Sequence, residues 1–232
     1  MNGLTVVSTS QERAFLSAFK DILMKNGGSQ YPNITRTDLR IEIPLVASQG
    51  FYEVDILKST GSGDRKLENK LQREHKFLAT AIALNLQKQV AGSEANAPLF
   101  THPDTNFFVG AGEAAALEPV YQGKIQFKSN QVLRSGEILT HRMRYCPAQG
   151  YQTAAAAGQA LEPAQYGPTD LERGYVDLVN VLVFDGQEST KLTLTLGAGT
   201  TAAILANTVA VVFISGFLYT GEEQNMSLVC PA

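Results

Sequence analysis

The C-terminal part of the chain, residues 97–232, consists of short β-forming runs separated by turns, and this pattern restricts the fold more than any other feature. Residues 138–145 (ILTHRMRY) and 191–196 (KLTLTL) alternate in polarity, as in a strand with one face in water. Residues 209–214 (VAVVFI) are apolar on both faces, which predicts a strand in the middle of a sandwich. Asp185-Gly186 predicts a hairpin turn. The spacing favours a β-sandwich, a jelly roll or a barrel, with strands expected at residues 107–109, 120–128, 138–145, 175–184, 191–196 and 209–219.

The N-terminal part begins with an amphipathic helix, expected over residues 11–25. Its apolar side chains recur at the spacing of one helix face; they are Phe15, Leu16, Phe19, Ile22 and Leu23. This stripe packs either on its own domain or on a neighbouring subunit. Phe15, Phe19, Ile22 and Leu23 are therefore candidate interface residues.

Two β-like runs follow the helix, at residues 39–43 and 51–57, and the turn Ser48-Gln49-Gly50 between them predicts a hairpin. After a flexible joint at residues 59–63, residues 64–90 show a second helical pattern. Its apolar face is formed by Leu67, Leu71, Leu78, Ile82 and Leu86, together with His75.

These patterns divide the chain into three parts. Residues 1–63 form an N-terminal helix and hairpin arm, residues 64–96 form a helical segment, and residues 97–232 form a β-sandwich domain of the jelly-roll type. The predicted fold class is thus mainly β with N-terminal helices.

Composition and charge narrow the classes of function. Hydrophobic residues make up 44% of the chain and charged residues 18%, below the usual quarter. This composition excludes a disordered tail and a coiled coil. The net charge of −3 gives no basic excess for nucleic-acid binding. Few charges are typical of surfaces that meet other subunits, although a small monomer would also fit.

Residues with catalytic chemistry are sparse. His75, His102 and His141 have no second ligand at metal spacing, and Asp104 beside His102 is better explained as a turn former than as part of a hydrolytic pair. No nucleophile elbow, phosphate-binding loop or dinucleotide fingerprint occurs in the sequence. Cys146 and Cys230 are expected to be reduced thiols. We therefore expect no catalytic, cofactor-binding or metal-binding residues and no enzymatic activity.

A small basic strip is expected on the wet face of the strand at residues 138–145. Arg134, Arg142, Arg144 and His141 would contribute to it. These side chains could contact a phosphate backbone, pair with acidic residues of a neighbour, or remain solvated. Arg142 and Arg144 are the remaining candidate interface residues.

The runs 120–128 (VYQGKIQFK) and 138–145, followed by 177–186 (DLVNVLVFDG) and 191–196, resemble structural proteins of bacteriophage particles. The resemblance covers residues 99–232 and is to the jelly-roll capsid proteins of tailless phages. Since the chain is short for two full jelly rolls, it implies one roll with arms or a compact double roll. Phage shells also use an α+β fold with an extended hairpin loop and a spine helix, which residues 39–57 and 64–90 would fit.

The resemblance implies a virion structural protein, most simply a capsid shell subunit that self-assembles through contacts of its β domain and arm. Its partners would be copies of itself and other virion proteins, with weak contact to an internal membrane or the genome left open. No cofactor or small-molecule substrate is implied, and the protein would reside in the virion after assembly in the host cytoplasm. A non-enzymatic β-sandwich module that binds a receptor or a carbohydrate is the alternative, and an unrecognised enzyme comes third.

The sequence shows no secretory signal at its start. Its longest apolar stretch, residues 208–219, is too short to span a bilayer.

Overall fold

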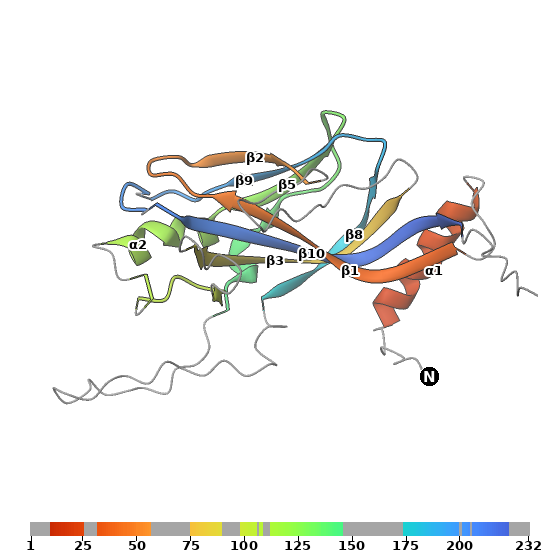
Figure 1. Cartoon of the computed structure of the whole chain (residues 1–232), viewed down its shortest axis with the longest axis horizontal. Helices are drawn as coiled ribbons and strands as arrows, with labels where there is room; N and C mark the ends of the chain where they lie inside the picture. Colours follow the sequence, from red (N-terminus) through yellow and green to blue (C-terminus); the bar gives the residue numbers. More distant parts are fainter. Residues whose placement is uncertain are drawn as a thin grey trace, which may run out of the picture.

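A computed structural model describes residues 10–25, 32–56, 75–89, 98–105, 107–108, 112–145, 174–199, 201–204 and 206–222. Within these residues the chain forms two antiparallel sheets and few helices, and Figure 1 shows the sheets as two layers. The mainly β fold predicted from the sequence is confirmed. The arrangement is compatible with a β-sandwich.

The larger sheet, sheet A, has the order β1–β10–β3, and both β4 and β8 pair with the far edge of β3. The strand β10 lies in the middle, as its apolar sequence predicts, with Val211 and Val212 fully buried on opposite faces. The strands are β1 (Pro32–Pro44), β3 (Lys76–Lys88), β4 (Leu99–Phe100), β8 (Tyr175–Asp185) and β10 (Thr208–Glu222).

The second sheet, sheet B, has the order β2–β9–β5, and both β6 and β7 pair with the far edge of β5. Its strands are β2 (Phe51–Asp55), β5 (Lys124–Ser129), β6 (Val132–Leu133), β7 (Ile138–Leu139) and β9 (Thr190–Thr195). The short helices are α2 (Glu113–Leu117), η3 (Glu118–Gln122) and η4 (Thr140–Met143).

The main core lies between the two sheets, because alternate side chains of each strand point toward the other sheet. On β1 the core residues are Leu39, Ile41 and Ile43, whereas Arg40 and Glu42 lie on the opposite, outer face of sheet A. The largest fully buried side chains of this core include Phe77, Phe108, Tyr121 and Phe127.

The N-terminal helix is confirmed as α1 (Ser10–Lys25). It packs beside the start of β1 and the end of β10 (Figure 1). Phe19 and Leu23 contribute to a second apolar cluster with Leu78, Phe217 and Tyr219 on the outer face of sheet A. The helix therefore buries part of its stripe on its own chain.

The predicted helix over residues 64–90 is wrong where it can be compared, because residues 76–88 form the strand β3. Ile82 and Leu86 are four residues apart, a spacing that fits about one helical turn but also two repeats of a strand. Leu78 lies on the other face of sheet A, because the register of β3 shifts between Ala79 and Ala81. Burial on both faces of sheet A selects the strand. The alternative α+β shell fold, which needs a spine helix here, is therefore wrong. The joint at residues 59–63 and the charged residues 64–74 lie outside the described residues.

The two predicted hairpins are also wrong, although their strands exist. β1 belongs to sheet A and β2 to sheet B, so the turn at residues 45–50 carries the chain from one sheet to the other. The turn at Asp185-Gly186 likewise connects β8 of sheet A with β9 of sheet B. Each sheet thus combines strands from residues 1–63 with strands from residues 97–232, so the sandwich is not confined to the predicted C-terminal domain.

Three expected strands differ from the structure. Residues 138–145 form only the short β7, followed by the 3-10 helix η4. Residues 120–122 belong to η3, and strand β5 begins at Lys124. Phe107 and Phe108 are not in a strand but pack their rings against Phe100. Short alternating or aromatic runs satisfy both strand and loop packing, so periodicity alone does not separate them.

Candidate functional site

The predicted interface residues of the N-terminal helix divide into two groups. Phe19 and Leu23 are 0% and 2% exposed, because they pack against Leu78, Phe217 and Tyr219. The side chains of residues 15 and 22 (Phe and Ile) lie outside the described residues. Phe19 and Leu23 therefore pack on their own chain, which is one of the two alternatives predicted for this stripe.

The predicted basic strip does not form, because its residues are not on one strand. Arg144 follows η4, and its guanidinium Nη2 lies 2.7 Å from Oε1 of Glu118. Arg134 lies 3.5 Å from Glu188. Arg142 is exposed and lines a pocket. Arg134 and Arg144 therefore form ion pairs within the chain with different acidic partners.

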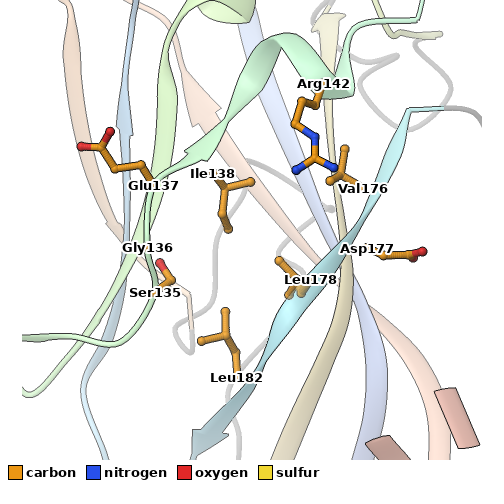
Figure 2. Close-up of a pocket in the computed structure, with 9 residues that line it drawn as sticks. All are labelled: Ser135, Gly136, Glu137, Ile138, Arg142, Val176, Asp177, Leu178 and Leu182. Atoms are coloured by element: carbon orange, nitrogen blue, oxygen red, sulfur yellow. The ribbon is translucent and has the colours of Figure 1, made fainter. Parts of the chain in front are cut away.

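This pocket opens at one side of the sandwich, between the segment leading into η4 and strand β8. Its volume is about 130 Å³. Figure 2 shows Ile138, Leu178 and Leu182 pointing toward one another across it, whereas the carboxylates of Glu137 and Asp177 point away. With an apolar interior and a charged rim, the pocket can hold a small apolar group. It does not present converging acid and base groups for catalysis.

The described residues contain no group of three or more His, Cys, Asp or Glu side chains that could hold a metal ion. His141 is exposed on η4. His102 is 6% exposed, and its Nδ1 atom has no hydrogen-bond partner among the described residues. Burial lowers the pKa of His102 below its ordinary value of 6.5, and the nearby Asp104 carboxylate opposes this shift in part.

Burial of His102 predicts a pH dependence of stability. Below pH 6.5 the unfolded chain binds a proton at this side chain more readily than the folded chain does, so the free energy of unfolding falls as the pH falls. Above this pH the histidine is neutral in both states and contributes no slope. We expect a His102→Asn variant to lose less stability than the wild type between pH 7.5 and pH 5.5 in urea unfolding. Parallel pH profiles of the two proteins would contradict this.

A polar network on the outer face of sheet A was not predicted. Nε of Arg40 donates a hydrogen bond of 2.9 Å to Glu42, and its Nη2 donates one of 2.9 Å to Oε1 of Gln87. Nε2 of Gln89 donates one of 2.8 Å to the other carboxylate oxygen of Glu42. The network connects β1 with the end of β3 across β10, on which Val211 is 0% exposed. Arg40 also lies over the Phe213 ring, 5.6 Å from its centroid.

A buried ion pair closes one end of the sandwich. Glu113, the first residue of α2, is 0% exposed, and its Oε2 lies 2.9 Å from Nζ of Lys88 at the end of β3. The hydroxyl of Thr208 donates a hydrogen bond of 2.9 Å to the other oxygen. The carboxylate thus connects α2 with the ends of β3 and β10. No sequence motif marks this pairing.

The outer face of sheet B carries a ladder of opposite charges. Glu53 on β2 lies 2.6 Å from Lys191 on β9 and 3.5 Å from Lys128 on β5. The hydrogen bond from Lys191 lowers the pKa of Glu53 below its ordinary value. Beside this ladder, the strands at the sheet edges carry half-exposed apolar side chains, namely Phe51, Val132, Leu133 and Leu139.

The described geometry is that of an antiparallel two-sheet β protein with networks of ion pairs and hydrogen bonds on the outer faces of both sheets. No family model, curated protein or solved structure matches the chain. Among the described residues, no helix has the length and apolar character needed to cross a membrane.

Proposed function

We propose that this protein is a structural subunit that assembles with copies of itself into the shell of a virus particle, and that its two sheets form a single jelly roll. The observation that carries the proposal is the nested order of strand pairing. In chain order, β1 pairs with β10, β2 with β9, β3 with β8, and β5 with β7. All these pairs are antiparallel. The first strand pairs with the last, and the pairing continues inward from both ends of the chain. This nested order is expected when one long antiparallel ribbon rolls into two sheets, as in jelly rolls.

A jelly roll occurs in capsid, lectin and cupin domains, so the fold alone does not select a function. The likeness of residues 120–145 and 177–196 to phage structural proteins favours the shell. So do the half-exposed apolar side chains at both edges of sheet B, Phe51 on one side and Leu133 and Leu139 on the other. Apolar groups at the edges of a fold suit contacts between neighbouring subunits.

The proposal implies copies of the same chain and other virion proteins as partners, and no substrate. It is tested by size-exclusion chromatography with light scattering over a hundredfold range of protein concentration. We expect the mean mass to rise with concentration into large oligomers. A monomer at every concentration, or saturable binding to a glycan array by a small discrete oligomer, would contradict the shell function and favour a binding module.

A further inference from the structure

The strand β1 lies at the edge of sheet A and offers its outer side for pairing. The amide of Leu45 donates to the Thr208 carbonyl of the segment entering β10, at 2.9 Å. Since the register is regular from Ile34 to Pro44, backbone groups of odd-numbered residues point toward β10. Those of even-numbered residues point outward. Among the described residues, no other strand pairs with this side of β1.

The even-numbered side chains of β1 alternate in charge along the outer face of sheet A. In order they are Arg36, Asp38, Arg40 and Glu42. Arg36 and Asp38 are exposed, and Arg40 is partly exposed. Pro44 has no amide hydrogen and therefore bounds the stretch of edge that can donate hydrogen bonds.

The alternation makes this edge complementary to itself in one antiparallel register. When two copies of β1 pair about a twofold axis at Leu39, Arg36 faces Glu42 of the second copy and Asp38 faces Arg40. A shift of the axis by one residue in either direction places like charges opposite each other. Opposite charges on directly facing strand residues stabilise a pair, and like charges destabilise it. Leu39 is also the midpoint between Ile34 and Pro44, so this register uses the whole available edge.

We propose that two copies of this chain join edge to edge through β1, which extends sheet A into one continuous sheet across the dimer. Arg40 and Glu42, already paired within each copy, then become part of a charge ladder that crosses the interface. A twofold contact of this kind is self-complementary, as symmetric homodimers require. The inference deepens the proposed function, because it names one of the contacts through which the subunit assembles.

The direct test compares Asp38→Pro with Asp38→Ala. The Asp38 amide points outward, so proline removes one hydrogen bond from each copy, two across the interface, and leaves the bonds between β1 and β10 in place. Alanine removes only the charge. We expect the proline variant to raise the dimer dissociation constant at least about tenfold, and the alanine variant to raise it less. Circular dichroism during thermal unfolding checks that each variant folds.

A charge variant tests the register even where the proline variant does not fold. Asp38→Arg places two arginines opposite each other, so it weakens the dimer at low salt and recovers part of the affinity at high salt. Asp177→Arg makes the same change on β8 at the opposite edge of sheet A and serves as the matched control. If Asp38→Pro and Asp38→Arg dimerise like the wild type, the β1 contact is wrong.

The outcomes separate this contact from the shell function. If the wild type forms particles and the β1 variants assemble equally well, the edge contact is wrong and the shell proposal is retained. Dimers that depend on Asp38 without larger assemblies support the edge contact and overturn the shell. A wild type that stays monomeric overturns both.

Discussion

Gly216→Ala lowers the free energy of unfolding by about 3 kcal/mol or more, the upper end of what single core substitutions do. Gly216 lies in β10, where a Cβ atom would overlap the backbone carbonyl oxygen of Leu78 on β3 and crowd the Phe77 ring. The register between the two strands shifts at this point. Because β10 pairs with β1 on one side and β3 on the other, the backbone cannot move away without loss of ladder hydrogen bonds.

Gly50→Ala is the matched control, since no atom of the described part of the chain lies within 4 Å of a Cβ atom at that position. Urea unfolding of both variants gives the comparison, with the control expected to stay within about 0.5 kcal/mol of the wild type. Equal effects of the two substitutions would contradict the close approach of β10 to β3 at Gly216.

Lys88→Met leaves the Glu113 carboxylate buried without its ion-pair partner and costs about 2–4 kcal/mol of stability. The range begins as low as about 2 kcal/mol because the Lys88 side chain is 26% exposed, although that of Glu113 is 0% exposed. Thr208 still donates its hydrogen bond but does not neutralise the charge. The loss comes from the desolvated carboxylate and not from the ion pair itself.

The double variant Lys88→Met with Glu113→Leu removes the charge together with its partner. We expect it to recover at least half of the stability lost in Lys88→Met, because an apolar pair can replace a buried ion pair at little cost. Glu113→Gln, which keeps the shape, should lie between the wild type and Lys88→Met. Chemical unfolding measures the wild type, the single variants Lys88→Met, Glu113→Leu and Glu113→Gln, and the double variant. Additive losses in the double variant would show that Lys88 and Glu113 act independently.

A sequence pattern predicts an element well when only one kind of secondary structure fits it. β10 is apolar on both faces at residues 209–214, which suits only a central strand. β9 alternates strictly, and α1 has a single stripe with a helical spacing. These elements fall close to their predicted positions because local spacing and tertiary burial agree.

The wrong predictions have two causes. Some patterns fit both a helix and a strand, and strand pairing depends on residues that are far apart in the sequence. Ile82 and Leu86 fit a helix and a strand equally, and only burial of both faces of β3 selects the strand. The residues of the turns after β1 and β8 predict a change of chain direction. They do not specify whether the next strand stays in the same sheet.

The polar contacts were beyond prediction for the same reason. Arg40 and Gln87 are 47 residues apart, and Glu113 and Thr208 are 95 apart, so no local pattern connects them. Gln87 was also expected on a helix. The alternation of Arg40 and Glu42 with apolar residues in β1 predicts a strand, but it does not predict the partners of these two side chains.

Electron microscopy of the protein purified from a recombinant host tests the central claim most directly, that this chain works by packing against copies of itself. We expect regular closed particles, or curved fragments with a repeating subunit, and fewer of them for Asp38→Pro. Isolated single subunits at every concentration, with no repeating contact between them, would contradict the account.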